Sequence, residues 1–363
     1  MTAIIHPRPN PIVAAMYTLR DMDVDVIVEH GPAGCSFMAS RPLENAGVRV
    51  VTSALGDKDL IFGGTDSLVR TLKEAKRKFN PRTMAVVGTC ASTIIGDDMG
   101  AAIKRAGIDD GCTVFQVDCH GCMADNTEGA IRALKAGAKA GIIGQDECDR
   151  QTILLKAATD LEKQRGMAAK AYLSPAVSPT KMNVCRRIAG ALKSGKKIAV
   201  VMIAKKELAY RFADLFVAVD EARKMLGGST LFVANIDGTV GLPRIRRYCA
   251  NISAELDADG VVIDKIIGGL DEYAIVGERM AREVDEFKPD MTVVIGICHA
   301  YPSLKKDDIL ITDQPRQLAN YLEQNFLCAV GEVSSHNMVM GASGIVHLET
   351  ADTLREIVRE MSQ

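Results

Sequence analysis

Two cysteines occupy positions that favour metal chemistry, because each lies in a small-residue turn at the end of a predicted strand. Cys35 lies in the turn EHGPAGCSF after the apolar run 24–30, and Cys90 lies in VVGTCASTIIGDD after the run 83–89. Open α/β sheets place their functional residues at the carboxyl ends of strands. Two thiols at one sheet edge therefore predict a metal site. The alternative for either turn alone is an incidental cysteine packed as a small apolar residue.

Two thiolates per chain would leave an iron–sulfur cluster incomplete. A four-iron cluster normally takes four cysteine ligands. A symmetric homodimer in which each subunit donates Cys35 and Cys90 would supply them, with the twofold axis passing through the cluster. We therefore expect one [4Fe–4S] cluster shared across a dimer interface. Asp97 and Asp98, which follow Cys90, are interpreted as the solvated first turn of a helix.

The CxxC motif formed by Cys119 and Cys122 is a further candidate for chemistry. Zinc would require a second pair of ligands close by, which the usual spacings do not provide. A thioredoxin-like role would require the motif to open a helix, whereas more loop follows it. The functional interpretation is a wall of the substrate pocket near the cluster, and the alternative is two buried thiols.

A basic cluster lies in the segment GLPRIRRY at 241–248. Arg244 and Arg247 are three residues apart on a predicted helix and share a face, whereas Arg246 points elsewhere. Guanidinium groups bind carboxylates in a bidentate manner, so this pair suits a substrate with several carboxylates. The alternative is a solvated helix face with acidic neighbours.

His299 is the histidine whose position best suits catalysis. It lies in GICHAYP, just past the carboxyl end of a predicted strand, and is a candidate proton donor. A lone histidine is more often structural, which is the interpretation for His6, His30 and His336.

The elements that position these residues alternate between short β-branched runs and helical stretches. This pattern predicts an α/β fold of Rossmann-like, doubly wound parallel-sheet domains. We expect a cluster-binding domain at 1–165, a second α/β region at 175–363, and a substrate pocket between them. Whether the second region divides again near residue 300, giving three domains, is left open. The predicted strands are 24–30, 83–89, 112–118, 197–204, 229–236, 260–268 and 291–299.

The composition agrees with this organisation. The chain has 363 residues, enough for two domains, with 47% hydrophobic and 25% charged residues. A net charge of −2 argues against a large nucleic-acid surface. Neither a secretory signal nor an apolar run of ~18 residues is present, so no membrane span and a cytoplasmic location are expected. The sequence has no GxxxxGK[ST] phosphate loop, so any ATP would be bound by another protein.

Three sequence blocks resemble component 1 of the nitrogenase superfamily: HGPAGC, IFGG at 61–64 and TCASTIIGDD. They span roughly the first third of the chain. The resemblance implies that Cys35 and Cys90 hold a cluster at a subunit interface. The larger nitrogenase and protochlorophyllide reductase subunits have a further cysteine upstream of the first block, and this chain has none before Cys35.

Most of the chain resembles a short methanogen family within this superfamily, the catalytic components of Ni-sirohydrochlorin a,c-diamide reductive cyclase. The similar segments include LENAGVRVVT, DNTEGAI, GLPRIRRY and GGLDEYAIVGE. The resemblance implies a homodimer with one [4Fe–4S] cluster and an ATPase partner, similar to the nitrogenase iron protein, that delivers electrons. The implied reaction reduces a nickel tetrapyrrole and closes a lactam ring on the way to coenzyme F-430 of methanogenesis.

The CxxC motif departs from that family. Three alternatives are therefore kept: a related tetrapyrrole reductase, such as one similar to protochlorophyllide reductase; a non-catalytic iron–sulfur scaffold; and an α/β nucleotide-binding enzyme with buried cysteines.

Overall fold

The chain divides into two compact units. The N-terminal unit comprises Thr2–Thr159 with Leu242–Arg244, and the C-terminal unit comprises Asp160–Gly241 with Ile245–Gln363. The boundary expected between residues 165 and 175 lies outside the described residues. The computed structural model describes residues 10–35, 37–108, 111–123, 125–164, 178–333 and 339–362.

The N-terminal unit contains a four-stranded parallel sheet in the order β2-β1-β3-β4. The strands expected at 24–30, 83–89 and 112–118 are confirmed as β1, β3 and β4. The fourth strand, β2, had not been predicted from the sequence. The bounds are β1 (Val26–His30), β2 (Arg49–Thr52), β3 (Thr83–Gly88) and β4 (Thr113–Val117).

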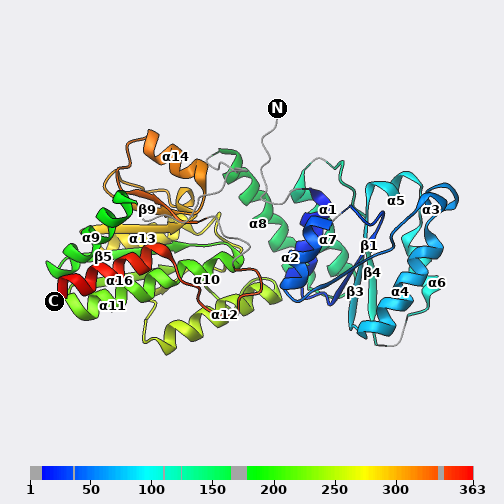
Figure 1. Ribbon diagram of the computed structural model, residues 1–363, viewed down its shortest axis with the longest axis horizontal. Helices are drawn as coiled ribbons and strands as arrows, with labels where there is room; N and C mark the ends of the chain where they lie inside the picture. The colour runs from blue at the N-terminus through cyan, green and yellow to red at the C-terminus, as the bar shows by residue number, and fades with distance from the viewer. Residues whose placement is uncertain are drawn as a thin grey trace. The chain divides into compact units, whose positions relative to one another are not determined.

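Helices cover both faces of this sheet (Figure 1). Helices α1 and α7 pack together on one face, and α4 and α6 pack together on the other. The helices are α1 (Pro11–Asp21), α2 (Phe37–Asn45), α3 (Asp57–Phe62), α4 (Thr65–Phe79), α5 (Cys90–Ile94), α6 (Met99–Ala106), α7 (Asn126–Lys139) and α8 (Gln145–Gln164).

The core of the unit forms because α4 repeats apolar residues at helical spacing. Leu68, Leu72 and Ala75 lie on one face of the helix and are buried. They belong to one cluster with Val28 of β1 and Val86 of β3, which are register partners in the sheet. Burial on both sheet faces explains why residues 26–28 of β1 and 84–87 of β3 are all apolar.

The C-terminal unit contains a six-stranded parallel sheet in the order β10-β9-β8-β5-β6-β7. Together with the first sheet it confirms the predicted α/β fold class. The strands are β5 (Lys197–Ile203), β6 (Ser229–Ala234), β7 (Lys265–Ile266), β8 (Met291–Gly296), β9 (Ile309–Thr312) and β10 (Ala329–Gly331).

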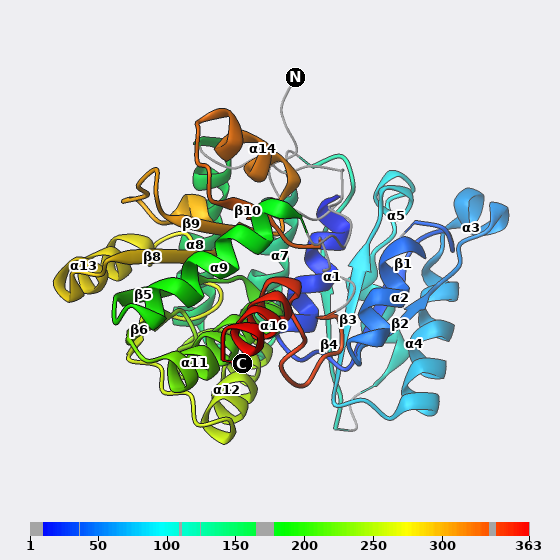
Figure 2. The ribbon, with the colours of Figure 1, turned by 60° about the vertical axis from the view of Figure 1, so that its left-hand side comes forward.

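Three helices of this unit, α9, α11 and α16, lie side by side (Figure 2). No helix among the described residues has the length and apolarity needed to cross a membrane. The helical segments are α9 (Pro179–Lys193), η1 (Lys206–Leu208), α10 (Ala209–Phe212), α11 (Asp214–Leu226), α12 (Pro243–Ala258), α13 (Gly277–Phe287), η2 (Cys298–Ala300), α14 (Pro315–Glu323) and α16 (Glu349–Ser362).

The strand predicted at 260–268 is wrong over most of its length. Only Lys265–Ile266 form a strand. Gly260 has a φ of 67°, and the amide of Val261 donates a hydrogen bond to the carbonyl of Leu256. These residues therefore terminate α12 in a left-handed turn, although their β-branched side chains suggested a strand.

Candidate metal centre at the edge of the N-terminal sheet

The strand order of the N-terminal sheet creates a topological switch point between β1 and β3. The chain leaves β1 toward β2 on one side and leaves β3 toward β4 on the other. In open parallel sheets, ligands bind at such a point, outside the carboxyl ends of the two strands. Cys35 lies in the turn after β1, and Cys90 lies directly after β3. The structure therefore places both predicted ligands at the switch point of one sheet.

Cys90 is positioned by a capped helix start and by a hydrogen bond to its sulfur. Thr89 is the N-cap of α5, and its own amide donates to Ser92 Oγ at 2.9 Å. The amide of Gly121, in the turn after β4, donates to Cys90 Sγ at 3.1 Å. A β-carbon on Gly121 would lie 3.2 Å from that sulfur, so glycine permits the approach. Hydrogen bonds of this kind tune sulfur ligands in iron–sulfur proteins.

Cys35 presents an exposed thiol on the neighbouring turn. Its amide donates to the carbonyl of Pro32 at 3.1 Å, which closes the turn. Partial burial, the nearby carboxylate of Glu29 and the thiol of Cys90 all raise the pKa of Cys35. The thiolate of Cys35 is thus unfavourable by itself, whereas a bound metal cation would stabilise it.

The two cysteine-bearing turns are joined through Thr89. Its hydroxyl donates to the carbonyl of His30, the last residue of β1, at 2.9 Å. Gly31 packs directly on the same side chain. The residue that caps the helix of Cys90 therefore also holds the start of the turn that leads to Cys35.

His30 extends this support to two further loops. Its Nδ1 lies 2.9 Å from Ser53 Oγ, and its Nε2 lies 2.9 Å from Asp97 Oδ2. Both oxygens of Asp97 also accept the amide hydrogen of Gly64. Burial lowers the pKa of His30 below its ordinary value, and the hydrogen bond and charge of Asp97 oppose that shift. His30 is structural, as interpreted from the sequence, and its partners tie the loops after β1, β2 and β3 together.

The interpretation of Asp97 as a solvated residue is wrong. Its side chain is only 5% exposed because it is enclosed by its contacts with His30 and Gly64. Asp98 does fulfil a helix-start role, since its Oδ1 accepts the amide hydrogen of Ala101 as the N-cap of α6. The sequence does contain a signal for the burial of Asp97: the two glycines of IFGG leave room for a carboxylate.

The two cysteines of the CxxC motif have different surroundings. Cys119 is fully buried, its thiol donates to Met123 Sδ at 3.6 Å, and burial raises its pKa to about 12. Cys122 is exposed, and its sulfur lies 3.9 Å from Cys90 Sγ. The motif therefore reaches Cys90 through the Gly121 amide and the Cys122 thiol, whereas the Cys119 thiol is turned into the core. Its role as a wall of a substrate pocket stays a prediction.

The arginines of α12 also differ in their surroundings. Arg244 is paired with Asp23 at 3.3 Å and also donates to the carbonyl of Ala46. Arg247 and Arg246 are exposed. Of the two predicted carboxylate anchors, Arg244 donates to Asp23 and Ala46, and Arg247 is the more exposed.

His299 lies in η2, directly beyond β8 of the C-terminal sheet, as its sequence position predicted. Its side chain is 5% exposed, and Nε2 lies 3.3 Å from Glu162 Oε1. Within the described residues, Nδ1 has no hydrogen-bond partner. A buried imidazole beside a carboxylate suits proton transfer, a role that stays a prediction. His6 and His336 lie outside the described residues.

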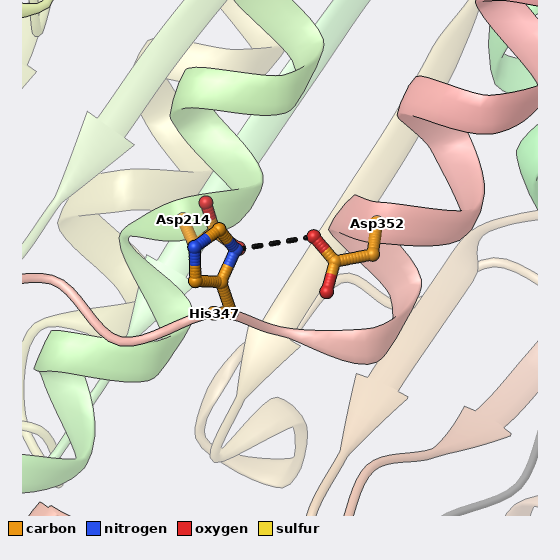
Figure 3. Close-up of side chains that lie close together, drawn as sticks. All are labelled: Asp214, His347 and Asp352. Carbon is orange, nitrogen blue, oxygen red and sulfur yellow. Dashed lines mark hydrogen bonds and ion pairs between the residues drawn. The ribbon is translucent and has the colours of Figure 1, made fainter.

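A group of potential metal ligands also occurs in the C-terminal unit, formed by Asp214, His347 and Asp352 (Figure 3). His347 Nδ1 lies 3.2 Å from Asp352 Oδ1. Asp214 accepts hydrogen bonds from Arg355 on both of its oxygens and from the amide of Leu348. Because the guanidinium already neutralises Asp214, we interpret this group as an ion-pair network rather than a metal site.

The N-terminal unit has a parallel sheet with two cysteines at its switch point. The sequence of this unit also matches a known protein family. The family described as nitrogenase component 1 type oxidoreductase matches residues 11–216. The chain belongs to this family and is an oxidoreductase.

Relatives similar over nearly the whole chain are named component CfbD of the Ni-sirohydrochlorin a,c-diamide reductive cyclase complex. The protein of Methanothermobacter thermautotrophicus is 42% identical, covering 98% of this chain and 100% of its own. The protein of Methanosarcina acetivorans is 43% identical, covering 99% and 98%. That of Methanocaldococcus jannaschii is 39% identical, covering 94% and 96%.

Proposed function

We propose that this chain is the catalytic component of an ATP-dependent, nitrogenase-like reductase that reduces and cyclises Ni-sirohydrochlorin a,c-diamide in coenzyme F-430 biosynthesis. The observation that carries the proposal is the 42% identity, over 98% of this chain, to a relative named for that complex. The relative is covered over its full length, so the comparison concerns whole chains and not one shared domain.

In this proposal Cys35 and Cys90 hold a [4Fe–4S] cluster together with the same residues of a second copy. The donor set fits such a cluster, because both thiols lie at one sheet edge and Cys90 Sγ accepts an amide hydrogen bond. The exposed position of Cys35 leaves its thiol accessible to a second chain. Two thiolates from each chain complete the four that the cluster needs, and twofold symmetry makes the two halves equivalent.

A bound cluster would supply one-electron transfer. Thr89 and His30 would orient the two ligands, because the hydrogen bond between them joins the two cysteine-bearing turns. Arg244 and Arg247 would bind substrate carboxylates in place of their present contacts. His299 would hold a proton on its imidazole beside Glu162.

ATP would be bound by a partner, an ATPase similar to the nitrogenase iron protein, because this sequence lacks a phosphate loop. The test is anaerobic reconstitution of the purified chain with that partner, ATP and candidate nickel tetrapyrroles. We expect reduced, lactam-containing product only when the partner and ATP are both present. ATP hydrolysis by the chain alone, at the rate of substrate reduction, would contradict the two-component scheme. Cluster transfer to an acceptor protein without tetrapyrrole turnover would favour a scaffold.

A further inference from the structure

Cys122 is a thiol that the proposed cluster does not account for, and it lies beside the cluster ligand Cys90. Their sulfurs are 3.9 Å apart, although the residues are separated by 32 positions in the sequence. The contact arises because the turn after β4 folds over the start of α5, where the Gly121 amide reaches Cys90 Sγ. The residue next to that amide is Cys122, so the hydrogen bond that orients Cys90 also brings the second thiol beside it.

The two cysteines of the CxxC motif are not equivalent partners for Cys90. Cys119 is fully buried and its thiol donates to Met123 Sδ, so a disulfide reagent cannot reach it in the folded chain. Cys122 is exposed. A disulfide requires the sulfurs to approach to about 2.05 Å, and rotation of the exposed Cys122 side chain is the movement that closes the distance.

We infer that Cys90 and Cys122 form a reversible disulfide in the cluster-free chain, and that this disulfide and the cluster exclude one another. The inference rests on the proposed function, in which Cys90 is a cluster ligand. A thiol that lies beside an iron ligand would thus protect that ligand from irreversible oxidation whenever the cluster is absent. Reduction of the disulfide would restore the ligand.

The reaction is a thiol–disulfide exchange with a small disulfide such as glutathione disulfide. The Cys90 thiolate attacks one sulfur of glutathione disulfide, whose S–S bond breaks and releases one glutathione thiolate. The Cys122 thiolate then attacks the Cys90 sulfur of the mixed disulfide and releases the second. Two electrons pass from the cysteines to glutathione disulfide, and the two thiol protons end on the two glutathione molecules.

The test uses the full chain, purified without oxygen, stripped of iron and fully reduced. It is treated with glutathione disulfide, unfolded in denaturant and alkylated, and mapped by mass spectrometry. Of the ten cysteines, we expect two to escape alkylation and to appear in one linked peptide pair that contains Cys90 and Cys122. Oxidised chain should lose most of its capacity to take up iron and sulfide, and a dithiol reductant should restore it.

Two variants serve as controls. Cys122→Ser should give no linked pair, because its Cys90 can form only the mixed disulfide with glutathione, which the peptide map detects. Cys119→Ala, which changes the buried cysteine of the same motif, should still give the link. Alkylation of all ten cysteines, a link between Cys35 and Cys90, or unchanged iron uptake by the oxidised chain would overturn the inference.

Failure of the inference can be separated from failure of the proposed function. If reduced Cys122→Ser binds one cluster per two chains while the wild-type chain forms no disulfide, the inference alone fails. If Cys90→Ser binds iron as well as the wild-type chain does, the proposed cluster site fails, and the mutual exclusion fails with it.

Discussion

A β-carbon on Gly31 would lie 2.4 Å from Thr89 Oγ1, so the first residue after β1 can only be glycine while Thr89 keeps its position. Thr89 in turn donates to the carbonyl of His30 and caps the helix that Cys90 opens. The close approach of Gly31 and Thr89 therefore sets the spacing of the two turns that carry the proposed ligands.

Gly31→Ala should weaken both folding and iron binding. The added methyl group meets the Thr89 side chain, and overpacking of this kind typically costs about 1–3 kcal/mol. Displacement of Thr89 would also move the start of α5 and with it Cys90. Gly34→Ala is the matched control in the same turn, because a β-carbon there would have no neighbour within 4 Å. Iron content and chemical denaturation of both variants check the prediction, and equal behaviour of the two would contradict it.

Much of the fold could be predicted from the sequence, because strands buried on both faces are continuous apolar runs. The runs that became β1, β3, β5 and β8 are of this kind, and each contains five to seven strand residues. The shorter strands β2, β7, β9 and β10 have two to four residues. Segments of that length are at or below the shortest pattern that identifies a strand, and tertiary pairing decides their structure.

The candidate site could be predicted only in part, because some of its features are local in the sequence and others are contacts between distant positions. Cys35 and Cys90 are local features, since each follows an apolar run and a turn of small residues. The pairing of His30 with Asp97 spans 67 positions, and that of Cys90 with Cys122 spans 32. Contacts of this kind depend on which strands become neighbours in the sheet, which no local pattern specifies.

Asp97→Ala should destabilise the N-terminal unit by about 2–4 kcal/mol, because it leaves His30 Nε2 and the buried amide of Gly64 without an acceptor. Asp98→Ala is the adjacent control and removes only the N-cap of α6, at a cost of about 1 kcal/mol. Chemical denaturation of the two variants compares the costs. If the cost of Asp97→Ala does not exceed that of Asp98→Ala, Asp97 would be a surface residue in solution.

Asp308 should make stability depend on pH in the direction opposite to that of most carboxylates. Burial raises its pKa from 3.8 to about 6. The folded chain then binds a proton more tightly than the unfolded chain, so stability is lost as pH rises from about 4 through 6. Asp308→Asn keeps an oxygen for the Lys305 amide, which now donates to Asp308 Oδ2 at 2.7 Å. It should stabilise the protein at pH 8 by up to about 3 kcal/mol and have little effect at pH 4.

Thermal unfolding of Asp308→Asn at the two pH values measures this difference. Asp307→Asn is the control, because Asp307 is exposed and acts on Asp308 only through its charge. It should change stability far less. A stabilisation of Asp308→Asn that is the same at pH 4 and pH 8 would mean that ionisation of Asp308 is not its cause.

Arg247→Ala should weaken binding of the tetrapyrrole by roughly ten- to a hundredfold, the effect of losing about 1.5–3 kcal/mol from one charged hydrogen bond. Arg246 is the matched control, because it is the preceding residue of α12, carries the same charge and is also exposed. Equilibrium titration of cluster-containing protein with the nickel tetrapyrrole compares the two. Equal affinities would assign Arg247 to the solvated face of the helix.

The proposed cluster predicts a stoichiometry and a pattern of losses. We expect one four-iron cluster per two chains, since each chain offers two ligands and the cluster takes four. Cys35→Ala and Cys90→Ala should each remove most of the iron, because symmetry turns every substitution into the loss of two ligands. Iron and sulfide analysis of anaerobically purified dimers, with their visible absorbance, measures both quantities.

Cys119→Ala separates this shared cluster from one built within a single chain. A cluster held by Cys35, Cys90, Cys119 and Cys122 of one chain would contain four irons per chain and would be lost with Cys119. The Cys119 thiol is instead buried against Met123, and removing it should cost packing energy but little iron. Cys122→Ala is the stricter test of which thiol is the ligand, because Cys122 Sγ lies only 3.9 Å from Cys90 Sγ. If it keeps its iron while Cys90→Ala does not, Cys90 is the ligand and Cys122 is its neighbour.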